Sequence, residues 1–172
     1  MMDIAIRFEE PEDFPAIKTL VTAAFGRDDT AQFVDAVRHH SRICLAQVAV
    51  AAGAIVGHAQ WCFAPIFVDE RRVDGAYLSC LSVRPDLQRQ DIGSRLVRDG
   101  LKCLCDRGIE AATLLGDPAF YGRFGFSSEL AARIAAPHRS RGLGFQAIEL
   151  HAGSLDGDRL RGDFPAVIAP TP

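Results

Sequence analysis

The pattern of apolar and polar positions predicts strands and helices that alternate along most of the chain. Short runs of β-branched and small apolar residues predict strands, and apolar residues three or four positions apart predict helices. The expected strands are residues 4–7, two strands within 43–68 joined by a turn at 51–53, then 76–83, 111–115 and 145–150. The expected helices are two between residues 11 and 40, a long one from 92 to a stop at Gly108, and a short one within 118–124.

The stretches between these segments are polar. Residues 69–72 predict a turn and residues 153–162 predict a loop. No repeat, low-complexity segment or interdomain linker interrupts the 172 residues. A chain of this length buries roughly 70% of its unfolded surface as one unit. We therefore expect a single α/β domain that spans residues 1–172.

The charge and hydropathy of the chain limit the classes of partner that we expect. The formal net charge is -3 and the isoelectric point is about 5.9, so no global positive field attracts nucleic acid or an anionic membrane. The N-terminus has no basic segment before an apolar stretch, and no apolar run approaches the roughly 20 residues of a membrane span. We expect a cytoplasmic protein with neither a nucleic-acid nor a membrane partner.

The cysteines and histidines do not indicate a metal site. Five cysteines are odd in number and form no Cys-x-x-Cys pair, which favours reduced thiols. His39 and His40 are adjacent on a predicted helix and therefore do not face one another. We expect no bound metal.

One connection carries candidate chemistry. The strand 76–83 is stopped by Pro85, and a polar loop leads into the helix at Ile92. A helix N-terminus offers free N–H groups and a dipole that favours anions. Arg89 and Arg95 could bind a phosphate, and Gly93 would let it approach the backbone. No dinucleotide or P-loop glycine motif is present, so these residues alone fit either a cofactor site or an ordinary helix start.

Two segments resemble the GCN5-related N-acetyltransferases (GNAT). Leu-Ser-Val-Arg-Pro-Asp-Leu-Gln-Arg-Gln-Asp-Ile-Gly-Ser at 81–94 resembles the acetyl-CoA signature of that family, a strand followed by Gln/Arg-x-x-Gly-x-Gly/Ala. Gly-Asp-Pro-Ala-Phe-Tyr-Gly-Arg-Phe-Gly-Phe at 116–126 is similar to its Phe-Tyr-x-x-x-Gly-Phe element, with a Gly-Asp-Pro lead-in like that of a branch of small bacterial members. The two segments also occur in the family's order.

The resemblance implies a fold and a cofactor. The implied fold is a mixed, mostly antiparallel sheet flanked by helices and splayed between strands four and five, with a core of about residues 4–126 and a last strand near 145–150. The implied cofactor is acetyl-CoA, as acyl donor, with no metal. By resemblance, the pantetheine pairs with the backbone of Leu81, Ser82 and Val83. The pyrophosphate is then held by Gln88, Arg89, Gln90, Asp91, Ile92, Gly93 and Ser94.

The family reaction is direct attack of an amine on the thioester, which requires positioning, a base and an acid. Tyr121 matches the family's general acid. Asp117, at the carboxyl end of the fifth strand, is our candidate base. His58, whose ordinary pKa is near neutral, and a water relay remain alternatives.

Asp91 departs from the family pattern, which has glycine there. Aspartate tolerates a left-handed backbone better than most residues, but it brings a negative charge toward an anion. We expect its carboxylate to turn to solvent or to pair with Arg89 or Arg95, and we expect weaker CoA binding than with glycine.

The resemblance therefore implies an N-acetyltransferase that acts on a primary amine of a small molecule or peptide. Two alternatives stay open: a non-catalytic CoA-binding or regulatory module, and an acyltransferase acting on a protein N-terminus or aminoacyl-tRNA. A homodimer is compatible with the resemblance. The residues to examine for the acceptor cleft are Phe25, Trp61, Phe63, Arg123 and His138.

Overall fold

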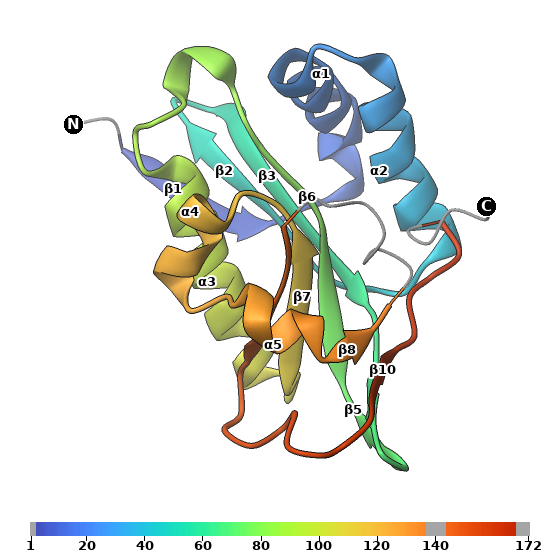
Figure 1. The fold of residues 1–172 in the computed structure, drawn as a ribbon. Helices are drawn as coiled ribbons and strands as arrows, with labels where there is room; N and C mark the ends of the chain where they lie inside the picture. The colour runs from blue at the N-terminus through green and yellow to red at the C-terminus, as the bar shows by residue number, and fades with distance from the viewer. Residues whose placement is uncertain (1–2, 137–143, 168–172) are drawn as a thin grey trace.

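The computed structural model describes residues 3–136 and 144–167 (Figure 1). In chain order its elements are β1 (Ile4–Phe8), the 3-10 helix η1 (Pro11–Asp13), α1 (Phe14–Phe25), α2 (Asp28–His40), β2 (Ile43–Ala51), β3 (Ala54–Phe63), β4 (Ile66–Val68), β5 (Arg71–Val73), β6 (Gly75–Val83), η2 (Pro85–Leu87), α3 (Ile92–Asp106), β7 (Ala111–Leu115), α4 (Pro118–Tyr121), η3 (Gly122–Phe124), α5 (Ser128–Ala132), β8 (Ile134–Ala135), β9 (Phe145–Glu149) and β10 (Leu160–Gly162). The mixed α/β fold expected from the residue pattern is confirmed.

The main sheet has the strand order β1-β2-β3-β6-β7-β9. Its neighbours are antiparallel except for β6 and β7, which are parallel. These two strands pair only from Gly75 with Ala111 to Leu78 with Leu114. The rest of β6 continues without a partner in β7, so the predicted splay is confirmed.

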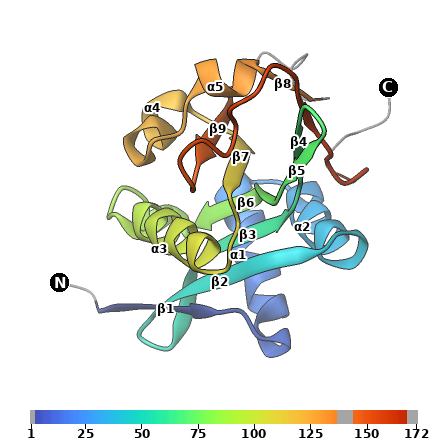
Figure 2. The ribbon, with the colours of Figure 1, turned by 90° about the horizontal axis from the view of Figure 1, so that it is seen from below.

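Helices cover both faces of this sheet (Figure 2). On one face, α1 and α2 pack Ile17 and Val34 against Val48 of β2. On the other, α3 packs Leu96 and Leu104 into the main core, and both side chains are fully buried. Each buried leucine contributes about 1.5–3 kcal/mol. This packing fixes α3 so that its N-terminus lies close to the end of β6.

A second, smaller sheet corrects two predictions. Its strand order is β5-β4-β10-β8. The turn predicted at 69–72 is wrong in its second half, because β5 already begins at Arg71. The loop predicted at 153–162 is also wrong at its end, because Leu160 to Gly162 form β10 and pair with β4. The polar composition hid this strand, whose Leu160 is buried while its neighbour Arg161 is exposed.

The histidine pair and the cysteines form no metal site among the described residues. His39 and His40 end α2 and are exposed, and all five cysteines are free. Within residues 3–136 and 144–167, no group of three potential ligands from His, Cys, Asp and Glu could hold a metal. Nor does that part of the chain contain a helix long and apolar enough to cross a membrane.

A buried ionic network joins β1, α2 and β3. The Glu9 carboxylate, at the end of β1, lies 2.9 Å from Nε2 of His58 and 3.1 Å from Nε of Arg38. Its side chain is only 10% exposed. Burial raises the pKa of Glu9, but the hydrogen bonds from His58 and Arg38 outweigh it and hold the pKa below its ordinary value. The network therefore stabilises the fold while Glu9 is ionised.

We predict that Glu9→Gln lowers the melting temperature at pH 7. Neutralising this partner leaves a buried guanidinium less well satisfied, which costs roughly 1–3 kcal/mol. A carboxylate with a depressed pKa contributes stability above its unfolded pKa and loses it as pH falls through the folded pKa. The difference from wild type should therefore shrink below about pH 4 in thermal denaturation.

Glu129→Gln is the matched control, because Glu129 is exposed and has no ion pair with another described residue. It should leave the melting temperature unchanged. A difference for Glu9→Gln that persists unchanged to pH 2.5 would contradict the assignment to charge.

Candidate functional site

The part of β6 beyond Leu78 offers a free strand edge. On one side it pairs with β3, from Gln60 opposite Cys80 to Gly57 opposite Val83. On the other side, no strand of the described chain pairs with it after Leu78. The ladder skips Ser79, which forms a β-bulge. The backbone predicted to pair with pantetheine therefore lies at an open edge.

Tyr121 lies at the mouth of this gap. Its ring packs directly over Gly116 at the end of β7, where any Cβ would collide with it. Edge-to-face contacts with Phe120 and Phe126, with centroids 4.8 and 6.0 Å away, hold the ring. Burial raises the pKa of the Tyr121 phenol, and the Cys80 thiol of β6 raises it further. The predicted acid is thus a half-buried phenol at the end of β7, and its surroundings favour the protonated form.

The predicted pyrophosphate loop closes the far end of the edge. Arg89 and Asp91 adopt left-handed conformations, with φ of 62° and 65°. Arg95 makes the first backbone bond of α3, to Asp91 at 2.9 Å. The N–H groups of residues 92–94 therefore lack intrahelical partners. Gln88 fastens the loop to the strand through a 3.1 Å bond from its amide to the Val83 carbonyl.

The Asp91 carboxylate turns to solvent, which is one of the two outcomes expected for it, but its ion-pair partner is not one of the two expected. Its carboxylate is exposed and bonds Arg98 at 3.3 Å, not Arg89 or Arg95. Arg95 instead donates to the carbonyl of Ile4 at 2.7 Å, and its contact with a phosphate stays a prediction. The reason is helix geometry, because Arg98 lies two turns along the same face as Asp91. Asp91 makes no side-chain cap of α3, so it does not compete for the free N–H groups.

The two candidate bases have different surroundings. Asp117 is exposed at the N-terminus of α4, where it accepts a 2.9 Å bond from the Ala119 N–H. His58 is fully buried, and its Nε2 is bound to Glu9. Its Nδ1 has no hydrogen-bond partner among the described residues. Asp117 can exchange a proton with solvent directly, whereas His58 cannot.

The candidates for the acceptor cleft are not brought together. Phe25 is 47% exposed at the end of α1, and Phe63 is half-buried with Arg42 stacked 4.4 Å over its ring. Trp61 is fully buried in the main core. Arg123 lies against Ser94 of α3, on the side of the pyrophosphate loop. His138 lies outside the described residues.

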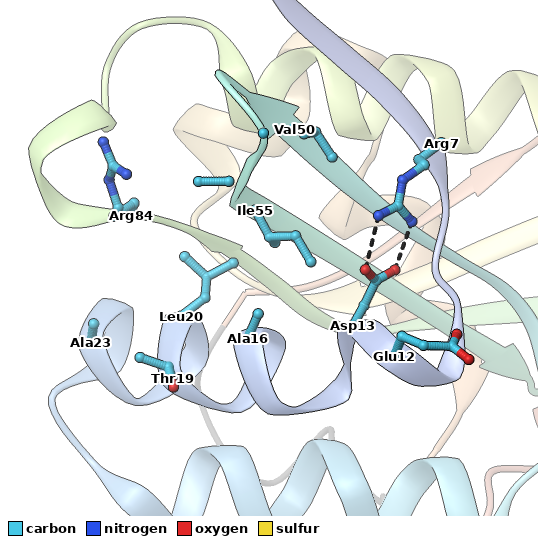
Figure 3. Close-up of a pocket in the computed structure, with 12 residues that line it drawn as sticks. Arg7, Glu12, Asp13, Ala16, Thr19, Leu20, Ala23, Val50, Ile55 and Arg84 are labelled. Carbon is cyan, nitrogen blue, oxygen red and sulfur yellow. Dashed lines mark hydrogen bonds and ion pairs between the residues drawn. The ribbon is translucent and has the colours of Figure 1, made fainter.

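A cavity of about 540 Å³ lies on the α1 face of the sheet (Figure 3). Leu20 and Ile55 line its middle, Arg7 and Asp13 lie at one end, and Arg84 lies at the other. The Arg7 guanidinium is bidentate to Asp13, at 2.6 and 2.8 Å, so its charge is neutralised. No residue of β7 or α4 lines the cavity, which is therefore separate from the gap beside Tyr121.

Comparison with known families decides the identity of the fold. The family model described as an acetyltransferase (GNAT) domain matches residues 5–128. The chain belongs to the GNAT acetyltransferase family. The match covers the free edge of β6, the loop, α3 and the turn that carries Tyr121.

Relatives of this GNAT chain agree with the assignment. The uncharacterized N-acetyltransferase YhbS of Escherichia coli K12 is 35% identical over 155 residues, covering 88% of this chain and 90% of YhbS. The crystal structure of Escherichia coli YhbS with CoA matches with a TM-score of 0.85 and 27% identity, over 100% of this chain and 95% of that one. A GNAT acetyltransferase of Brucella melitensis with acetyl-CoA matches with a TM-score of 0.76 and 27% identity, over 96% and 98%.

The position of Asp91 predicts its effect on this GNAT loop. Its carboxylate adds a negative charge beside the helix N-terminus, and among the described residues one exposed ion pair, to Arg98, offsets it. We expect Asp91→Gly to bind CoA roughly three- to tenfold more tightly in calorimetry, since glycine adopts the same φ without strain or charge.

Asp91→Asn separates the two contributions, because asparagine tolerates the left-handed conformation and removes only the charge. It should recover most of the gain. Unchanged or weaker CoA affinity in Asp91→Gly would contradict the prediction.

Proposed function

We propose that this GNAT protein binds acetyl-CoA along the free edge of β6 and transfers the acetyl group to a primary amine of a small molecule or peptide. The proposal is supported by one continuous surface that joins a strand edge to a helix N-terminus. An unpaired strand edge begins beside the Tyr121 phenol and leads to a helix N-terminus with unpartnered N–H groups. The CoA and acetyl-CoA of the related structures have this polarity, with a thiol or thioester at one end of the pantetheine arm and phosphates at the other.

The cofactor would satisfy groups that the protein leaves open. The amides of pantetheine are peptide-like, so they can pair with the backbone of Leu81 to Val83 as a missing strand would. The pyrophosphate would then reach the loop from Gln88 to Ser94. There the N–H groups of α3 and the positive end of its dipole stabilise negative charge.

The reaction needs no covalent enzyme intermediate. The neutral amine attacks the thioester carbon, a C–N bond forms, the C–S bond breaks and the CoA thiolate leaves. Tyr121 would donate its proton to that thiolate. An ordinary phenol near pKa 10 is a weaker acid than a thiol near 8.5 by about 1.5 units, roughly 2 kcal/mol. Burial weakens the phenol further, but it disfavours the free thiolate in the same way.

Asp117 is the base in this proposal. It lies at the carboxyl end of β7, and the Tyr121 N–H bonds to its carbonyl at 3.0 Å, so base and acid share one turn. Its exposure lets the proton leave to solvent. We assign His58 a structural role, because it is fully buried and engaged by Glu9.

We favour catalysis over a non-catalytic CoA module because Tyr121 matches the family's general acid and lies at the end of β7, beside the gap. We propose that residues 1–172 form a single domain that acts in the cytoplasm without a metal. A homodimer is compatible with this activity.

The first experiment is a screen of free amines with acetyl-CoA that detects the released thiol. With an active amine, Tyr121→Phe should lower kcat roughly 10- to 100-fold with little change in the KM for acetyl-CoA. Wild-type kcat should show no loss from phenol ionisation up to about pH 10, because the raised pKa keeps Tyr121 protonated.

Tyr77→Phe is the matched control, since the second tyrosine packs against Phe164 away from the gap and should keep full turnover. Equal kcat for wild type and Tyr121→Phe at saturating amine would remove the phenol from the mechanism. Absence of acetyl-CoA binding would remove the whole proposal.

The base is tested with Asp117→Asn, because asparagine can still accept the hydrogen bond that caps α4. We expect kcat/KM for the amine to fall roughly 100-fold at pH 7. The loss should shrink as pH approaches the pKa of the amine, where free amine no longer needs a base. A ratio near one at pH 7, with His58→Gln strongly impaired but folded, would transfer the role to His58.

A further inference from the structure

Arg123 holds a defined position at the N-terminus of α3, although it comes from a distant part of the sequence. One of its terminal nitrogens donates to the Ser94 hydroxyl at 3.2 Å, and its Nε donates to the Phe120 carbonyl at 3.2 Å. The guanidinium lies over the rings of Phe120 and Phe124, 4.8 and 5.4 Å from their centroids. Stacking and hydrogen bonds together orient the group.

The charge of Arg123 is not compensated. Arg98, which also lies over the Phe124 ring, is paired with Asp91, but Arg123 forms no salt bridge with any residue in 3–136 or 144–167. It also stands at the positive end of a 15-residue helix, where a cation is electrostatically unfavourable. An anion between the helix end and the guanidinium would relieve this repulsion.

Arg123 lies beyond the end of the free β6 edge, next to the N-terminus of α3. A Cβ built on Gly93 would lie 3.5 Å from Val83 and 3.8 Å from Phe120. Gly93 therefore lies between the end of β6 and the aromatic residues that support Arg123. A chain leaving the edge at Val83 and passing Gly93 reaches Ser94 and the guanidinium next.

We propose that Arg123 binds the pyrophosphate of CoA, opposite the free N–H groups of α3. This inference rests on the proposed function and adds to it a residue from outside the loop. A guanidinium is suited to the task, because its fork can bind two phosphate oxygens at once. The Ser94 hydroxyl accepts from one of the guanidinium donors that could bind the phosphate.

The test compares CoA with two of its fragments that carry successively fewer phosphates. Calorimetry gives the dissociation constants of CoA, of dephospho-CoA, which lacks the 3′-phosphate, and of pantetheine, measured by competition at millimolar concentration. Arg123→Gln should weaken CoA and dephospho-CoA by roughly tenfold each and leave pantetheine within about twofold. Arg123→Lys, which keeps the charge without the fork, should lose roughly threefold for the first two.

Arg107→Gln is the matched control, because Arg107 follows the opposite end of α3, stacks over Phe8 at 4.9 Å and bonds the Cys44 carbonyl at 2.6 Å. It should change none of the three affinities. Equal losses for all three ligands in Arg123→Gln would show that the residue only holds the turn of Tyr121, and would overturn the inference.

Two further outcomes are distinguishable. A loss for CoA but not for dephospho-CoA would move the contact to the 3′-phosphate and overturn the assignment to the pyrophosphate. Failure of the wild-type protein to bind any of the three ligands would instead reject the proposed function itself.

Discussion

The site depends on one unfinished ladder in the main sheet. Strand β6 is bonded to β3 along its length but loses β7 after Leu78. Unpaired backbone groups in a largely buried strand are costly unless something satisfies them. Strand β7 cannot do so, because its chain turns away at Gly116 and Pro118 into α4. An extended, peptide-like ligand is the natural complement to such an edge.

The turn that ends β7 gives the gap its chemistry. Gly116 has no side chain, so the ring of Tyr121 can lie directly on the backbone and reach toward Cys80 across the gap. The same short turn directs Arg123 back toward α3. The two ends of the pantetheine arm of a bound acetyl-CoA would thus meet side chains only two positions apart in sequence, one at the thioester and one at the pyrophosphate.

The loop before α3 shows how backbone geometry and charge can be satisfied separately. The left-handed φ at Asp91 is the requirement that glycine meets in the family, and aspartate meets it less easily. Its charge is directed to Arg98, away from the free N–H groups.

On the other face of the sheet, Glu9 binds His58 and Arg38, which ties β1 to α2. This network joins elements on the face opposite α3 and contributes no residue to the gap.

The sequence by itself determined the elements around the site. The periodicity of β6, the stop at Pro85 and the spacing of α3 are local patterns, and the two motifs placed Tyr121 and the loop in one family. Only the tertiary structure decided the partners of charged side chains and the pairing of short strands. Arg95 donates to the Ile4 carbonyl, and Asp91 forms its ion pair with Arg98. Arg123, which was a candidate for the acceptor cleft, lies instead against Ser94 at the loop. The strand β10 and the Glu9–His58 bond likewise join residues far apart in sequence. Such contacts depend on how elements pack, and no local pattern records that packing.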